Sequence, residues 1–236
     1  MRLSAPVYHL KRRARKLARD HDISLHEALD RIARQEGFAR WSLLAAGLNR
    51  AEAGALLPRF AQGDLVLLGA RPGHGKTLQG LRVLLEAAEV GREAVFYTLE
   101  LTETEVRHRL HRLGRAGADG AQIRIETSDD ISAAFICADL ATAARGTVAV
   151  VDYLQILDQD RHKPPLAEQL RTLRNFAQLR GLILVFISQI DRSFAPGPTA
   201  LPGLADIRRP NPVPNVFSKA CFLHDGMLRI ETVADL

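Results

Sequence analysis

The segment Asp64-Leu-Val-Leu-Leu-Gly69 runs directly into Ala70-Arg-Pro-Gly-His-Gly75-Lys76-Thr77, and this junction decides the fold of the chain. The first part is a short, continuous apolar run, which is typical of a strand buried on both faces. The second part is rich in glycine, and the leucines between positions 78 and 85 recur at helical spacing. Strand, glycine-rich loop and helix in this order fit a P-loop, here with alanine in place of the first glycine.

A P-loop binds phosphate through its backbone. Small residues let successive main-chain N–H groups wrap a phosphate, and the N-terminus of the following helix adds its dipole. We expect Lys76 to reach the β- and γ-phosphates of ATP and the Thr77 hydroxyl to hold Mg²⁺, so both cofactors are predicted. An ordinary glycine-rich turn is the alternative interpretation. The predicted nucleotide-binding residues are Arg71, Pro72, Gly73, His74, Gly75, Lys76, Thr77 and Leu78.

The rest of the body alternates strand and helix patterns, which predicts an α/β fold with a mainly parallel central sheet flanked by helices. The predicted strands are Ala94–Thr98, Ile123–Glu126, Thr147–Val151 and Leu182–Ile187. Helical periodicity predicts helices near residues 102–114, 131–144 and 165–179. Two further apolar segments, Ala220–His224 and Met227–Thr232, flank an Asp-Gly pair and predict a β-hairpin at one edge of the sheet.

Polar side chains follow three of the predicted strands at the point where each strand ends, namely Glu100, Asp152 and Gln189. In an open α/β sheet, ligands bind beyond the carboxyl ends of the strands, so these residues should converge with the P-loop on one cleft. We expect Asp152 to face Mg²⁺ through its water shell and Glu100 to polarise the attacking water. Gln189 is expected to sense the γ-phosphate. A carboxylate that follows a strand can also serve only as a helix cap.

The positive charge of the chain is concentrated at its N-terminus. The whole sequence of 236 residues has a formal net charge of +5, whereas residues 1–50 hold 11 Lys and Arg against 5 Asp and Glu. Such asymmetry suggests a segment that meets a polyanion, attached to a near-neutral body. We expect a small all-helical module over residues 1–48, a connecting helix and turn over 49–62, and an ATPase domain over 63–236.

The first 48 residues contain two clear helix patterns and one weaker one. Val7 to Asp20 is amphipathic and strongly basic, and its predicted DNA-contacting residues are Arg12, Arg15 and Arg19. A solvated face that keeps the protein soluble is an equally good interpretation of this charge. Next, Ser24 and Glu27 have the spacing of a capping box, and a buried stripe is expected from Leu25, Ala28, Leu29, Ile32 and Ala33. The apolar segment 38–48 could close a three-helix module.

Composition excludes several classes of protein. Hydrophobic residues make up 47% and charged residues 25% of the chain, as in an ordinary globular protein. No apolar run approaches the ~20 residues that span a bilayer, so we expect no membrane association. Cys137 and Cys221 lie in apolar surroundings far apart in the sequence, and no apolar segment follows the basic N-terminus. We therefore expect a cytoplasmic protein.

Four motifs resemble one known family in their order, spacing and wording: the P-loop at 70–77, Phe96–Glu100, Val151–Ile156 and Ile187–Arg192. They are similar to motifs of the C-terminal ATPase domain of DnaB-like replicative DNA helicases. The resemblance implies a RecA-like fold, ATP hydrolysis with Mg²⁺ in DNA replication, and a homo-oligomeric ring, usually hexameric, that moves along single-stranded DNA. It makes Lys76 and Thr77 nucleotide and metal contacts, Glu100 the catalytic base, Asp152 the acidic partner of Mg²⁺ and Gln189 the coupling residue.

The long segment from Asp191 to Phe217 is rich in Pro and Gly, and segments of this length are usually functional. Within it, Leu204–Arg208 resembles the stretch with which the family contacts single-stranded DNA. The predicted DNA-contacting residues of this segment are Arg192, Arg208 and Arg209. An ordinary exposed loop is the alternative.

The sequence also departs from the family. The family's larger helical N-terminal domain organises the ring and recruits primase, and neither role transfers to the small basic module found here. No Lys-x-Arg segment follows the last predicted strand, and the loss of an arginine supplied in trans would leave a slow ATPase. Three functions therefore stay open: a helicase or translocase, a nucleotide-switched DNA-binding accessory ATPase such as a loader, partition or recombination factor, and a regulatory interaction module whose basic helices bind a protein or RNA.

Overall fold

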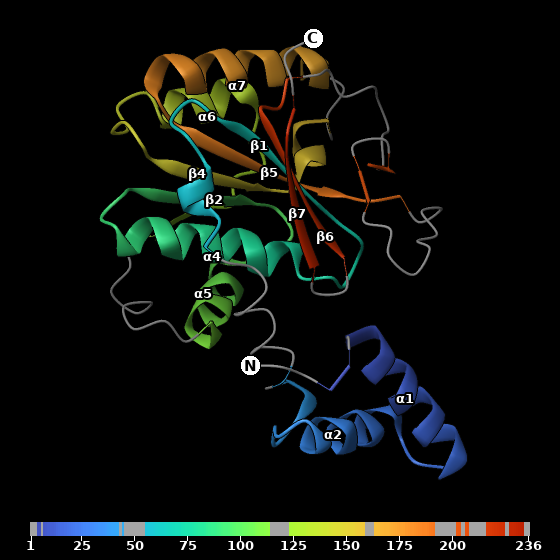
Figure 1. The fold of residues 1–236 in the computed structure, drawn as a ribbon. Helices are drawn as coiled ribbons and strands as arrows, with labels where there is room; N and C mark the ends of the chain where they lie inside the picture. The colour runs from blue at the N-terminus through green and yellow to red at the C-terminus, as the bar shows by residue number, and fades with distance from the viewer. Residues whose placement is uncertain are drawn as a thin grey trace. The chain divides into compact units, whose positions relative to one another are not determined.

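The chain divides into two compact units, with Met1–Gly54 forming most of the first and Ala55–His224 most of the second. The first contains the N-terminal helices and the second contains the sheet (Figure 1). The computed structural model describes residues 4–5, 7–42, 44, 55–113, 123–158, 163–191, 202–203, 206–207, 216–224 and 227–233. No helix in these residues is long and apolar enough to cross a membrane.

The first unit is built on two helices, α1 (Val7–Asp20) and α2 (Leu25–Gln35), which share a small apolar core. The Ser24 hydroxyl caps α2 by accepting a hydrogen bond from the Glu27 N–H at 3.1 Å. The Glu27 carboxylate, however, accepts from Arg31 instead of completing the predicted capping box. The buried core residues are Leu10, Ala14, Ala28, Ile32, Ala33 and Leu44.

Leu25 was expected in this core, but it is the first residue of α2 and is 45% exposed. Of the apolar segment predicted over 38–48, residues 43 and 45–48 lie outside the described residues. The same holds for residues 49–54 of the predicted connection. Its described part contains η1, a single 3-10 turn over Leu57–Arg59 with Pro58 at its start.

The second unit alternates strands and helices as the sequence predicts. The strands are β1 (Leu65–Ala70), β2 (Ala94–Thr98), β3 (Ile123–Glu126), β4 (Val148–Asp152), β5 (Ile183–Gln189), β6 (Lys219–His224) and β7 (Met227–Thr232). The helices are α4 (Lys76–Glu89), α5 (Glu103–Arg112), α6 (Ala133–Asp139), the 3-10 helix η2 (Leu154–Asp158) and α7 (Leu166–Arg180). The α/β fold class is confirmed.

The described strands form one seven-stranded sheet in the order β3-β2-β4-β5-β1-β6-β7. Strands β1 to β6 pair in parallel throughout. Figure 1 shows α4 on one face of the sheet and α6 with α7 on the other. Because both faces are covered, the central strands β1, β2, β4 and β5 are nearly continuous apolar runs, whereas the edge strand β3 alternates.

The helix α4 packs unusually close to the sheet at Gly80. A Cβ atom added there would lie 2.8 Å from the Ile187 Cδ1 atom and 3.0 Å from the Val150 Cγ1 atom. The glycine therefore lets the first turns of α4 approach β4 and β5. This approach sets the distance between the start of α4 and the ends of those strands.

Two element boundaries differ from the prediction in a way that matters for the site. Strand β4 includes Asp152, and β5 extends to Gln189, whereas both residues were expected to follow their strands. The reason is pairing across the sheet, because Asp152 lies opposite both Thr98 of β2 and Ile187 of β5. The backbone of both polar residues is therefore held by the sheet rather than by a loop.

Helix α6 is shorter than the predicted 131–144 segment. It begins after Ser132, whose hydroxyl accepts from the Phe135 N–H at 3.2 Å, and ends at Asp139. Asp139 is bound to the sheet there, since its carboxylate accepts from the Tyr97 hydroxyl of β2 and from Arg124 of β3 at 2.8 and 2.7 Å. Helix α6 therefore ends before the alanine-rich residues that were expected to continue it.

Candidate nucleotide-binding site

The carboxyl ends of β1, β2, β4 and β5 lie along one edge of the sheet. Ala70 at the end of β1 is paired with Gln189 at the end of β5. Asp152 at the end of β4 lies between Thr98 and Ile187 in the same ladder. The strand order therefore brings together the side chains that the sequence places after separate strands.

The P-loop leaves β1 at Ala70 and enters α4 at Lys76. Gly73 and Gly75 have φ angles of 79° and 82°, and a Cβ atom on either would meet nothing within 4 Å. Glycine is therefore required by the left-handed backbone rather than by crowding. No side chain caps the first turn of α4, so its N–H groups suit an anionic ligand.

The remaining residues predicted to bind nucleotide belong to this loop and to the first turn of α4. Arg71, His74 and Thr77 are half-buried, whereas Pro72 and Gly73 are exposed. Leu78 is 37% exposed, on the outer side of the first turn of α4. The structure thus leaves one side of the loop open to solvent.

Lys76 lies between Glu100, the predicted catalytic base, and Asp152, the predicted partner of Mg²⁺. Its Nζ atom is 4.0 Å from Glu100 Oε2 and 3.8 Å from Asp152 Oδ1, and its side chain is only 15% exposed. The aromatic ring of Tyr153 also lies beneath the ammonium group, with its centroid 5.9 Å from Nζ. The ammonium group of Lys76 is therefore held by the carboxylates of Glu100 and Asp152 and by the ring of Tyr153.

The oxygens of Thr77 and Asp152 fit a magnesium ion. The Thr77 hydroxyl donates to Asp152 Oδ2 at 2.7 Å, while Oδ1 of the fully buried carboxylate has no hydrogen-bond partner. Mg²⁺ prefers such hard oxygen ligands and is usually held by one or two protein groups plus substrate phosphates and water. No cluster of three or more His, Cys, Asp and Glu side chains occurs in the described residues, so phosphate and water would have to complete the shell.

The electrostatics of Asp152 reflect its burial. Desolvation raises the pKa of its carboxyl above the ordinary value, while Lys76, the Thr77 hydroxyl and the charge of Arg109 act in the opposite direction. A buried carboxylate is costly unless cations or hydrogen bonds compensate it. The ionised form of Asp152 therefore depends on the cations around it.

Gln189 comes directly before the segment 190–207, whose two ends lie side by side. Ile190 forms an antiparallel bridge with Ile207, and the Asp191 N–H donates to the Asp206 carbonyl at 2.7 Å. The part of this segment near Ile207 has a further contact, because Arg229 of β7 donates a hydrogen bond to the Pro202 carbonyl at 2.8 Å. The predicted DNA-contacting residues Arg192, Arg208 and Arg209 lie outside the described residues.

Comparison with known proteins gives both sequence relatives and structural neighbours. No protein-family model matches the chain. Two curated proteins of Chlamydia trachomatis, one of them from serovar L2, are named probable plasmid replicative DNA helicase. Each is 25% identical to the present chain over a region that covers 63% of the present chain. The chain spans only 40% of the length of these relatives.

Solved structures share the fold. One solved ATPase domain superposes with a TM-score of 0.58 over 70% of both chains, at 19% identity. A DnaB-like replicative helicase, described with its interactions with primase, superposes with the same score over 91% of this chain and 66% of its own, at 16% identity. The chain resembles the ATPase domain of DnaB-like replicative helicases. This confirms both the resemblance inferred from the motifs and the RecA-like form of the sheet.

Three residues around the candidate site were not predicted as site residues. Tyr153 lies beneath Lys76, Arg109 of α5 acts on Asp152, and His224 of β6 stacks on His74 of the P-loop. Tyr153 was within reach of prediction because it directly follows Asp152. The other two come from elements whose position depends on the tertiary structure.

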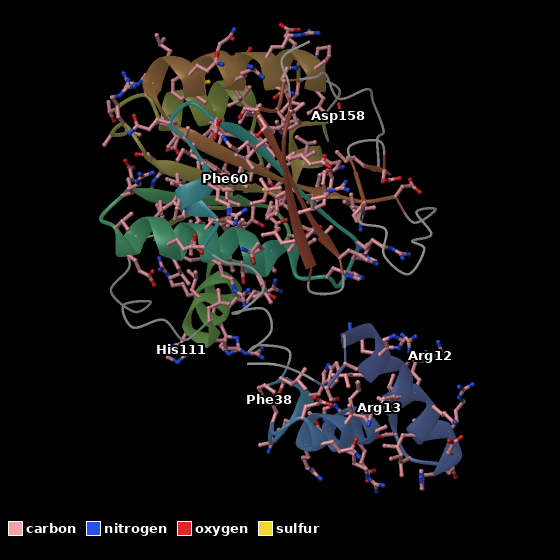
Figure 2. All side chains as sticks on the ribbon, in the orientation of Figure 1. Arg12, Arg13, Phe38, Phe60, His111 and Asp158 are labelled. Atoms are coloured by element: carbon pink, nitrogen blue, oxygen red, sulfur yellow. The ribbon has the colours of Figure 1, made fainter. Side chains whose placement is uncertain are left out.

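The N-terminal arginines of the prediction belong to the other unit. Arg12, Arg15 and Arg19 are exposed, and Lys16 lies among them on the same side of α1. Arg13, in contrast, donates to Gln35 at 3.0 Å. Figure 2 shows Arg12 on the side of α1 that faces away from α2. We call Arg12, Arg15, Lys16 and Arg19 the basic stripe.

Proposed function

We propose that the chain is an ATP-hydrolysing, DnaB-like DNA helicase or translocase that binds single-stranded DNA in replication. The single observation that carries this proposal is the convergence of Lys76, Thr77, Glu100 and Asp152 at one edge of the sheet. These residues come from three separate strand ends. Their convergence supplies phosphate, metal and water contacts within one site, as phosphoryl transfer requires.

The loop and Lys76 would bind the triphosphate. The N–H groups of the loop and of the first turn of α4 would wrap the phosphates, and the lysine would exchange its carboxylate contacts for phosphate oxygens. Thr77 and Asp152 would hold Mg²⁺, which when bound neutralises charge that develops on the phosphates. Because the groups are already assembled, little rearrangement would be needed on binding.

Glu100 would orient the attacking water and accept its proton. Its side chain is 48% exposed, so water can reach it. One carboxylate oxygen lies 4.0 Å from Nζ of Lys76, the residue that would bind the triphosphate. The backbone N–H of Glu100 donates to the Thr98 hydroxyl at 3.2 Å, which fixes the turn after β2. The carboxylate is therefore held on the open side of the site.

Gln189 would couple the nucleotide to DNA. The glutamine is paired with the first residue of the P-loop, and the bridge between Ile190 and Ile207 follows it directly. Movement of Gln189 on loss of the γ-phosphate would therefore move both ends of the segment between Ile190 and Ile207. By the resemblance, that segment contacts DNA in a homo-oligomeric ring.

The proposal predicts ATP hydrolysis that single-stranded DNA stimulates and that chelation of Mg²⁺ abolishes. Phosphate release from the wild-type chain, with and without DNA, measures both effects. Strand displacement on a forked duplex then separates a helicase from a nucleotide-switched accessory ATPase, which would hydrolyse ATP without separating strands. A chain that releases no phosphate under any of these conditions would contradict the proposal.

The basic stripe supports a contact between the N-terminal module and nucleic acid. Its four side chains have no carboxylate within ion-pair distance in the described residues, while the apolar side of α1 is buried in the module core. A membrane-binding helix would need that apolar side free, so the stripe fits phosphates better than lipid. It has no aromatic side chain, so it would contact the DNA backbone rather than stack on bases.

Replacing Arg12, Arg15 and Arg19 together with alanine is expected to weaken binding to single-stranded DNA and to reduce its salt dependence. Each lost phosphate contact lowers the slope of log K against log salt by ~0.7, so three losses would lower it by about 2. Fluorescence anisotropy over a salt series measures this slope.

A matched control removes three arginines that already pair with groups of their own chain, namely Arg13, Arg31 and Arg107. It changes the net charge equally but removes no free guanidinium. If both triple variants change the slope by the same amount, the stripe acts only through net charge. An unchanged slope in the stripe variant would remove the N-terminal module from the DNA-binding surface.

A further inference from the structure

The P-loop carries a ring contact to the edge of the sheet. The imidazole of His74 stacks on that of His224, with ring centroids 5.1 Å apart and an angle of 10° between the planes. His224 is the last residue of β6 and is only 8% exposed. Strand β6 lies directly beside β1, with Leu223 opposite Ala70, so the partner ring stands next to the point where the loop begins.

The position of His74 within the loop gives this contact its significance. It stands between Gly73 and Gly75, whose added Cβ atoms would meet nothing within 4 Å. Glycines place little restriction on the backbone, which is held here by two local hydrogen bonds, from the His74 N–H to the Arg71 carbonyl at 3.2 Å and from the Gln79 N–H to the Gly75 carbonyl at 2.9 Å. A ring stacked on a buried side chain of the sheet limits that freedom at the middle of the loop.

We infer that His74 and His224 act as a positioning pair that keeps the phosphate loop in its binding conformation before nucleotide arrives. This inference rests on the proposed function, since it assigns the loop to a triphosphate. A loop that adopts the competent conformation only part of the time binds with an affinity reduced by that fraction. The stack raises this fraction, so it affects nucleotide affinity rather than the chemical step.

The first measurement compares His224→Ala with His224→Phe. The alanine variant should bind ATP with Mg²⁺ about three- to tenfold more weakly than wild type, the range expected for one aromatic pair, and raise KM with kcat little changed. The phenylalanine variant keeps a ring at the same place and should restore most of the affinity. His74→Ala should match His224→Ala, and the double variant should be no weaker than either.

A second measurement does not depend on nucleotide. Hydrogen exchange of the amides at 70–77 should be faster in His224→Ala than in wild type and should return toward wild type in His224→Phe. His21→Ala, an exposed histidine of the first unit, serves as the control. Thermal unfolding of each variant shows whether the sheet is intact, and a global rise in exchange would reveal unfolding rather than a local effect.

The two measurements separate two kinds of failure. If wild type binds no ATP but loop exchange still follows the ring at position 224, the proposed function fails and the positioning pair stands. If wild type binds ATP and His224→Ala changes neither the affinity nor loop exchange, the pair is a packing contact only. Equal impairment by alanine and phenylalanine at position 224 would also overturn the inference, because the ring would then not be the active feature.

Discussion

Lys76→Ala is expected to lower the rate of ATP hydrolysis at least about a hundredfold and to weaken ATP binding as well. The ammonium group is the one cation placed between Glu100 and Asp152 at distances of 4.0 and 3.8 Å within the described residues. Removing a preorganised group that stabilises developing charge typically costs ~10²–10³ in rate. Because lysine would contact the phosphates in the ground state and more strongly in the transition state, KM should rise and kcat should fall.

Phosphate release under saturating ATP, combined with equilibrium binding of ATP, measures these two effects. Arg82→Ala is a suitable control, since it removes a cation from the same helix, where the guanidinium donates to Gln79 at 3.4 Å. The control should retain activity. Hydrolysis that survives in Lys76→Ala at the wild-type rate would show that the P-loop does not bind the reacting phosphates, and the proposed function would be lost with it.

Glu100→Gln is expected to separate binding from chemistry. The amide keeps the size of the side chain but cannot accept a proton, and the loss of a general base lowers rates by about 10² to 10⁴. ATP binding should stay the same or become slightly tighter, because a negative charge near the triphosphate is removed. The variant should therefore lower kcat while leaving affinity intact, unlike Lys76→Ala.

Single-turnover hydrolysis and equilibrium binding on the same preparation test this separation. Glu103→Gln supplies the control, because Glu103 lies three residues further on, is 58% exposed and pairs with Arg107 on α5. If Glu100→Gln hydrolyses ATP as fast as Glu103→Gln, Glu100 is not the base. Its position after β2 would then reflect the turn into α5 alone.

Local patterns in the sequence predicted most of the secondary structure. The strands Ala94–Thr98 and Ile123–Glu126 and the helix Val7–Asp20 have the expected bounds. Such patterns succeed because apolar periodicity and capping residues report on the backbone of their own segment. The P-loop was predictable for the same reason, since its glycines, its strand and its helix are contiguous in the chain.

The errors have a common physical cause. Asp152 and Gln189 were expected after their strands but lie within them, and Leu25 was expected in the core but is exposed. Each error depends on what a neighbouring element does, through sheet pairing in the first two cases and through the facing helix in the third. Tertiary contacts override local preference at such positions.

The sequence by itself determined an α/β chain with a phosphate-binding loop and polar residues at the ends of its strands. Only the tertiary structure decided that Thr77 meets Asp152, 75 residues away, and that Lys76 lies between two carboxylates. It also decided that His74 meets His224 and that Asp139 fastens α6 to β2 and β3. These contacts depend on the order β2-β4-β5-β1-β6 of the strands, and an apolar strand carries the same hydrophobic pattern whichever neighbour it pairs with.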